Sequence, residues 1–248
     1  MREVLVIGIG AGDPDQLTIE AVKALGRLDA AFLVDKGDAK RDLTDLRLDL
    51  LKQYAPDARV VIVEDPPRDR TADQYPGAVD DWRRKRTTEF QNLIENELAD
   101  AQTGGFLVWG DPALFDSTIG VLDDIDGVEF GYRVIPGISS VSTLAARHRI
   151  GLNRVGRPVQ ITTGRRLAEQ GMPDGVDDLV VMLDARTAYQ HVTGDVDIYW
   201  GAYLGTPDEI LISGPLDETK DRIDAVRAAA RARKGWIMDT YLLRRRDA

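Results

Sequence analysis

The sequence predicts an α/β protein of two domains, with a mainly parallel sheet in the N-terminal half and a mixed sheet in the C-terminal half. In residues 1–137, short apolar strands alternate with amphipathic helices. Strands that are apolar on both faces are typical of parallel sheets covered by helices. After residue 137, strands follow one another with fewer helices between them. Glycine- and proline-rich turns also close three of the strands, as expected where an α/β sheet binds a ligand.

In the first half, the helices and strands are read from the spacing of apolar residues. We expect strands at 3–9, 30–34, 60–63, 105–109 and 132–135, and helices at 18–27, around leucines 43, 46, 50 and 51, at 81–101 and at 117–124. Residues 64–80 contain three prolines and little periodicity, which predicts a mobile or ligand-ordered loop.

In the second half, after the turn at 136–137, strands and helices no longer alternate regularly. We expect helices at 139–149 and 217–234 and strands near 158–163, 178–183, 197–203, 209–213 and 236–243. This pattern places the domain boundary near residue 137 and predicts domains 1–137 and 138–248.

Composition excludes several classes of protein. The 248 residues carry 42 acidic and 32 basic side chains, and a net charge of −10 disfavours generic binding of nucleic acid. No apolar run approaches the roughly 20 residues that span a bilayer. The N-terminus lacks a leader-like segment, so we expect a cytoplasmic protein without membrane partners. The chain has no cysteine, and its two histidines share no ligand-like spacing with carboxylates, so no metal site is expected.

Three turns are the most informative local feature. Gly-Asp-Pro occurs at residues 12–14 and again at 110–112, and Pro136-Gly137 closes a third strand. Glycine lets the backbone approach a ligand closely, and proline stops the strand. These turns predict a small-molecule site at the carboxyl ends of the strands.

A nicotinamide dinucleotide site is the first alternative. Gly8 and Gly10 follow a strand, and Asp35 ends the next strand, as in that motif. The third glycine is missing, and Pro14 delays the helix whose N-terminus would bind pyrophosphate. A phosphate-binding loop of the Gly-Lys-Ser/Thr type is also absent from the sequence.

The chain resembles the tetrapyrrole methylase family at residues 8–18, 110–115 and 134–140. One difference is Ala11, where the family usually has proline. The resemblance covers nearly the whole chain. It implies a class III methyltransferase fold of two α/β domains, with S-adenosylmethionine in the cleft between them. Relatives are commonly homodimers.

Further stretches resemble one branch of the family, whose members methylate precorrin-5 at C1 and release its acetyl group as acetate. These stretches are residues 34–37, 145–153, 161–165 and 235–243. Three alternatives remain. The chain could be a methyltransferase for uroporphyrinogen III or precorrin-4, a nicotinamide-dependent oxidoreductase, or a non-catalytic tetrapyrrole-binding protein.

The resemblance also implies which residues bind the cofactor. They are Pro14, Gly110, Asp111, Leu114, Ser139 and Ser140, with Leu183 and Leu204 as approximate counterparts in the second domain. For Asp111, capping of backbone N–H groups is an equal alternative to cofactor contact.

The implied substrate carries many carboxylates, for which arginine is the suitable partner. Arg147 and Arg165 are the expected substrate-binding residues, and Arg83, Arg84, Lys85 and Arg86 form a basic start to the helix near residue 81. Deacetylation requires a general base and an oxyanion donor, for which we expect Asp35 and Lys36. His148 is interpreted as an exposed helix residue.

Overall fold

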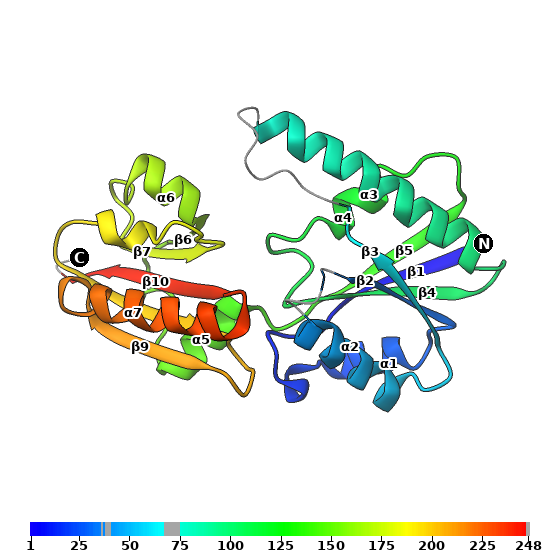
Figure 1. Cartoon of the computed structure of the whole chain (residues 1–248), viewed down its shortest axis with the longest axis horizontal. Helices are drawn as coiled ribbons and strands as arrows, with labels where there is room; N and C mark the ends of the chain where they lie inside the picture. The colour runs from blue at the N-terminus through cyan, green and yellow to red at the C-terminus, as the bar shows by residue number, and fades with distance from the viewer. Residues whose placement is uncertain (36, 38–40, 67–74, 247–248) are drawn as a thin grey trace. The chain divides into compact units, whose positions relative to one another are not determined.

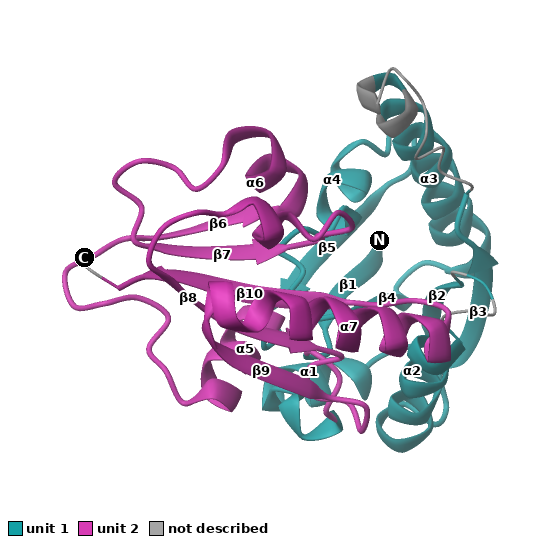
Figure 2. Cartoon of the chain, turned by 60° about the vertical axis from the view of Figure 1, so that its left-hand side comes forward, with its two compact units in different colours: residues 1–10, 14–138 teal, residues 11–13, 139–248 magenta. Residues whose placement is uncertain are grey.

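The computed structural model describes residues 1–35, 37, 41–66 and 75–246, which form two compact units (Figure 1, Figure 2). Unit 1 comprises residues 1–10 and 14–138, and unit 2 comprises residues 11–13 and 139–248. The expected domains differ from these units at residues 11–13 and 138, and their status as domains stays a prediction. No helix among the described residues is long and apolar enough to cross a membrane.

Unit 1 contains the expected parallel sheet. Its strands are β1 (Arg2–Gly8), β2 (Ala30–Asp35), β3 (Arg59–Glu64), β4 (Thr103–Val108) and β5 (Phe130–Ile135), in the order β3-β2-β4-β1-β5. All four neighbouring pairs are parallel. The carboxyl ends of the central strands therefore lie at one edge, where Gly8 is in register with Val108 and Ile7 with Ile135.

Helices cover both faces of this sheet, which explains why its strands are apolar on both sides. Leu5 and Ile7 of β1 face the cluster that includes leucines of α1 (Ile19–Leu25) and α2 (Arg41–Tyr54). Val4 and Val6 face the opposite cluster, which includes residues of α3 (Tyr75–Glu97) and α4 (Thr118–Asp123). A short 3₁₀ turn, η1 (Pro14–Gln16), precedes α1, whose N-cap Thr18 accepts a hydrogen bond from the amide of Ala21 at 3.0 Å.

The start of α3 corrects the sequence interpretation. The helix begins at Tyr75 and ends at Glu97, whereas we expected it at 81–101 after a loop at 64–80. Pro76 is compatible with helix here, because an N–H in the first turn has no helical acceptor to lose. Residues 67–74 of the expected loop lie outside the described residues.

Unit 2 contains the expected mixed sheet. Its strands are β6 (Val159–Thr163), β7 (Asp178–Met182), β8 (Val196–Ala202), β9 (Ile210–Pro215) and β10 (Asp239–Arg245), in the order β6-β7-β10-β8-β9. β6 and β7 are parallel, and the other neighbours are antiparallel. The helices α5 (Ser140–His148) and α7 (Leu216–Lys234) were expected. The helix α6 (Gly164–Gln170) and the 3₁₀ turn η3 (Ala188–His191) were not, because each is too short to show helical periodicity.

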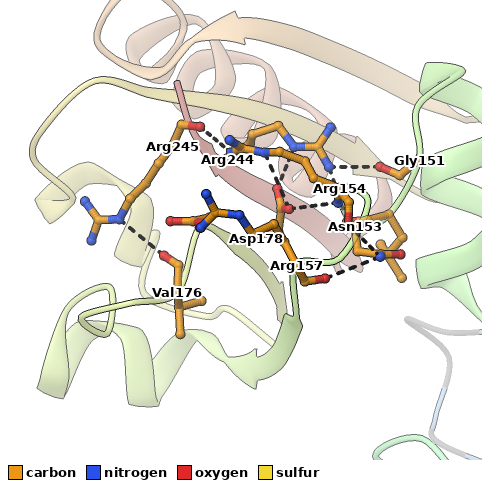
Figure 3. A network of polar contacts seen from close by, with 10 residues as sticks. Gly151, Asn153, Arg154, Arg157, Val176, Asp178, Arg244 and Arg245 are labelled. Atoms are coloured by element: carbon orange, nitrogen blue, oxygen red, sulfur yellow. Dashed lines mark hydrogen bonds and ion pairs between the residues drawn. The ribbon is translucent and has the colours of Figure 1, made fainter. Parts of the chain in front are cut away.

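A buried carboxylate forms ion pairs at one end of the second sheet (Figure 3). Asp178, at the start of β7, is fully buried and forms ion pairs with Arg244 at 2.5 Å and Arg154 at 3.7 Å. Arg244 also donates to the carbonyls of Gly151 and Leu152, so Asp178 joins β10 to the loop that precedes β6. Removing one member of such a group leaves buried charges without compensation.

The change Asp178→Asn is expected to lower the free energy of unfolding by about 3 kcal/mol, because two partly buried guanidinium groups lose their shared anion. Asp177→Asn is the matched control, since the ion pair of Asp177 is with Arg157, whose side chain is 53% exposed. It is expected to cost under about 1 kcal/mol. Urea denaturation of both variants provides the measurement, and equal losses would contradict this account.

Candidate functional site

Three backbone segments of unit 1 come together where β1, β4 and β5 end. A Cβ atom built on Gly137 would lie 2.1 Å from the carbonyl oxygen of Gly110 and 2.8 Å from the Cα of Gly8. Gly110 also pairs with Gly10, and the amide of Gly110 donates to the carbonyl of Gly10 at 2.8 Å. Only glycine fits such a close approach of backbone to backbone. The glycines of the expected turns therefore meet in space.

Asp111 holds this meeting point together. Its Oδ2 accepts a hydrogen bond from the amide of Gly137 at 2.9 Å, and its Oδ1 accepts one from the amide of Ala113 at 2.8 Å. Both carboxylate oxygens thus bind backbone N–H groups, as in the capping alternative for this residue. Asp111 fixes the turn after β4 to the turn after β5.

The other expected cofactor residues of unit 1 lie in the same turns. Leu114 is half-buried, and its amide donates to the carbonyl of Asp111 at 3.1 Å. The next residue, Phe115, has a φ of 52° and a 47% exposed side chain. Pro14 is exposed and begins η1. An exposed aromatic ring on strained backbone is typical of a ligand-binding turn.

In unit 2, the two expected serines stand at the start of α5. Ser139 is the N-cap, and its Oγ accepts a hydrogen bond from the amide of Ser142 at 3.3 Å. Ser140 Oγ lies 3.2 Å from Oγ1 of Thr240 on β10. Both serine hydroxyls therefore have partners within unit 2, and the first of them explains why the helix begins here.

Leu183, directly after β7, has a φ of 55° and a side chain that is 62% exposed. The neighbouring Asp184 is buried and accepts hydrogen bonds from the amides of Arg186 at 2.9 Å and Ala188 at 2.7 Å. The hydroxyl of Tyr241 donates to the same carboxylate at 2.7 Å. These bonds stabilise the turn in which Leu183 has an exposed side chain. They also stabilise its backbone conformation, which leucine rarely adopts.

Leu204 has a different setting, because it is buried. A Cβ atom on Gly201 would lie 2.6 Å from the Leu204 side chain, so the leucine packs directly on β8. The preceding residue, Tyr203, has a φ of 49°, and its hydroxyl donates to the carbonyl of Trp236 at 2.6 Å. Leu204 could present only its backbone and a small part of its side chain to a ligand.

The two arginines expected to bind substrate already have acidic partners. Arg147 on α5 forms ion pairs with Glu209 at 3.2 Å and Asp13 at 3.5 Å. Arg165 on α6 is half-exposed and lies 4.0 Å from Glu169 one turn further along the helix. Two carboxylates around Arg147 offset its positive charge, which argues against a role in binding a substrate carboxylate.

The basic stretch of α3 is also paired, and it lies within the helix rather than at its start. Arg83 pairs with Asp124, Lys85 pairs with Asp81, and Arg86 pairs with Asp65. Arg86 is buried, and its guanidinium lies 5.1 Å from the ring centres of both Trp82 and Phe90. Arg86 therefore contributes to packing, whereas Arg83, Arg84 and Lys85 are exposed and paired with acidic side chains.

Asp35, the expected general base, is the last residue of β2 and is half-buried. Its Oδ1 accepts a hydrogen bond from the amide of Gly37 at 3.1 Å. Its expected partner Lys36 lies outside the described residues. The position of Asp35 at the carboxyl edge of the sheet agrees with the expectation, and its catalytic role stays a prediction.

The interpretation of His148 as a solvent-facing residue is wrong. Its Nε2 lies 3.0 Å from the carbonyl oxygen of Trp200, and its ring stands edge-on to Tyr199. Burial lowers the pKa of His148 below its usual value, although the bond to Trp200 and the charge of Glu209 oppose this. The residue joins α5 to β8 and is held in its neutral form at physiological pH.

Sequence analysis missed a half-buried arginine on α2. Arg47 donates from Nε to the carbonyl of Leu107 at 3.0 Å, and its Cζ lies 5.9 Å from the centre of the Trp109 ring. A signal was available, because residue 47 falls at helical spacing between Leu43 and Leu50, on the apolar side of the helix.

Comparison with known proteins identifies the family. The model of the Tetrapyrrole (Corrin/Porphyrin) Methylases matches residues 3–220, so the chain belongs to this family. A precorrin-6A synthase (deacetylating) from Sinorhizobium sp is 49% identical over 99% of this chain and 96% of its own length.

Solved structures agree with this assignment. A cobalamin synthesis related protein, CobF, from Corynebacterium diphtheriae has a TM-score of 0.83 and 37% identity, with 98% of each chain covered. A uroporphyrin-III C-methyl transferase from Thermus thermophilus, solved with S-adenosylhomocysteine, has the same fold. It has a TM-score of 0.58 and 19% identity, with 97% of this chain and 96% of that chain covered.

The close contact at Gly137 gives a direct test of the site. In Gly137→Ala, the new methyl group would collide with the Gly110 carbonyl, so we expect displaced turns and at least a tenfold loss of affinity for S-adenosylhomocysteine. Gly131→Ala, in the strand β5 that precedes this turn, meets only the Met1 side chain at 3.7 Å and is the control. Calorimetric titration of both variants is the measurement. Unchanged affinity in the first variant would show that the turns do not form the site.

Proposed function

We propose that this chain is an S-adenosylmethionine-dependent C-methyltransferase of corrin biosynthesis. It methylates precorrin-5 at C1, releases the acetyl group as acetate and forms precorrin-6A. The observation that carries this proposal is the 49% identity with a precorrin-6A synthase (deacetylating) along almost the whole of both chains. The glycine meeting point of unit 1 supports it, because the turns that mark the family are the turns that come together.

The residues proposed to hold the methyl donor are those that the family resemblance implies. They are Pro14, Gly110, Asp111 and Leu114 in unit 1, and Ser139, Ser140, Leu183 and Leu204 in unit 2. The glycines of unit 1 allow its turns to approach one another closely. Phe115 and Leu183 add exposed apolar surface, which fits the adenosine and methionine parts of the donor. Asp111 contributes by positioning the turn, since both its oxygens bind backbone amides.

S-adenosylmethionine supplies an electrophilic methyl group when it is bound, and the protein must hold the acceptor carbon in line with it. The protein must also promote the loss of the acetyl group. We assign the general base to Asp35 because its carboxylate ends β2 at the ligand-binding edge of the sheet. Among the described residues, only its Oδ1 has a hydrogen-bond partner, the amide of Gly37.

The direct test is to incubate the purified protein with precorrin-5 and methyl-labelled S-adenosylmethionine. We expect labelled precorrin-6A and an equal amount of acetate, detected by mass spectrometry. Uroporphyrinogen III and precorrin-4 are the control substrates, and we expect neither to be methylated at a comparable rate. Methylation of either control without acetate release from precorrin-5 would overturn the proposal.

A further inference from the structure

Arg47 occupies an unusual place for a charged residue. It belongs to α2, between Leu43 and Leu50 on the side of the helix that packs on the sheet. Leu50 and Leu51 of the same helix belong to the core cluster of that face. An arginine at such a position must be held by polar partners, or it must serve a ligand.

The polar partners of Arg47 use only part of its guanidinium. Nε donates to the carbonyl of Leu107 at 3.0 Å, and Nη1 donates to the carbonyl of Leu43 at 3.0 Å. Among the described residues, no partner is found for the N–H groups of Nη2 or for the second N–H of Nη1. The group therefore retains paired donors of the kind that bind a carboxylate in a bidentate manner.

The charge of Arg47 is also uncompensated at close range. Among the described residues, no carboxylate lies within 4.0 Å of it, whereas Arg86 has Asp65 and Arg147 has Asp13 and Glu209. Burial lowers the pKa of Arg47 to about 10, an effect that Asp116 opposes and Arg86 reinforces. Arg47 thus remains protonated at neutral pH in surroundings that favour the arrival of an anion.

The location is the ligand-binding edge of the first sheet. Pairing between β2 and β4 extends only from Ala30 to Phe32 and from Gly104 to Phe106. Just beyond it, Arg47 binds the carbonyl of Leu107, which is followed by Trp109 and the Gly110 turn. Among the residues that the structure describes, the buried Nε1 of Trp109 has no hydrogen-bond acceptor, and unsatisfied buried donors are uncommon away from functional sites.

We propose that Arg47 binds a peripheral carboxylate of the tetrapyrrole substrate, with the Trp109 ring beside it as a flat apolar surface. This inference rests on the proposed function only in taking the substrate to be a tetrapyrrole polycarboxylate. It adds Arg47 to Arg147 and Arg165, whose roles in binding substrate stay predictions.

The test compares Arg47→Gln with Arg2→Gln. Arg2 is a matched control, because it too donates from Nε to a backbone carbonyl of unit 1, that of Leu98 at 2.8 Å. It lies at the opposite end of the same sheet, at the start of β1. Each variant is titrated with uroporphyrin III, a fluorescent tetrapyrrole polycarboxylate, and separately with S-adenosylhomocysteine.

Arg47→Gln is expected to weaken uroporphyrin III binding by about 10- to 100-fold, the usual effect of losing a charged hydrogen-bonding group. Its affinity for S-adenosylhomocysteine and its circular dichroism spectrum should be unchanged, and Arg47→Lys should recover part of the loss. Arg2→Gln should bind uroporphyrin III as the wild type does. Equal binding by wild type and Arg47→Gln, equal losses in both glutamine variants, or no binding by the wild type would each overturn the inference.

Turnover of precorrin-5 separates this inference from the proposed function. If the wild type converts precorrin-5, Arg47→Gln should raise KM by about 10-fold or more with little change in kcat. If the wild type does not convert it but the two variants still differ in uroporphyrin III binding, the proposed function fails and the role of Arg47 stands.

Discussion

The contact of backbone with backbone among Gly8, Gly110 and Gly137 is the constraint on which the rest of unit 1 depends. A side chain on Gly137 would overlap the Gly110 carbonyl, so the ends of β1, β4 and β5 can approach as they do only with glycine there. The parallel order of the sheet brings these ends to one edge. The closeness of the turns therefore follows from both topology and residue size. The turns that meet lie at the edge where such sheets bind ligands.

In both units, an aspartate carboxylate stabilises the turn at the end of a strand. Asp111 follows β4 and accepts a hydrogen bond from the amide of residue 113. Asp184 follows β7 and accepts a hydrogen bond from the amide of residue 186. Each carboxylate then binds a more distant donor, the amide of Gly137 or the hydroxyl of Tyr241. In each case the turn that is held carries an exposed apolar residue with positive φ, Phe115 or Leu183. A carboxylate with several donors can maintain such strain because its bonds are charge-assisted.

The sequence predicts the sheet type, most strands and the meeting of the turns, because these depend on local patterns that have few structural solutions. Apolar strands between amphipathic helices require a covered parallel sheet, and Gly-Asp-Pro requires a turn. The sequence does not predict which charged side chains form ion pairs. Whether Arg147 is available to a substrate depends on Glu209 and Asp13, which are distant in sequence. The bond of His148 to Trp200 and the bond of Arg47 to the carbonyl of Leu107 depend likewise on tertiary placement. The elements α6 and η3 are too short to show periodicity.

We propose that Asp111 supports the cofactor site through the backbone turns that it joins. Calorimetric titration of Asp111→Ala with S-adenosylhomocysteine tests it most directly. Asp126→Ala is the control, since Asp126 also binds a neighbouring amide, that of Gly127 at 2.9 Å, but joins no second strand. We expect at least a tenfold loss of affinity in Asp111→Ala, because two charge-assisted hydrogen bonds are lost, and no loss in the control. Wild-type affinity in Asp111→Ala would contradict it.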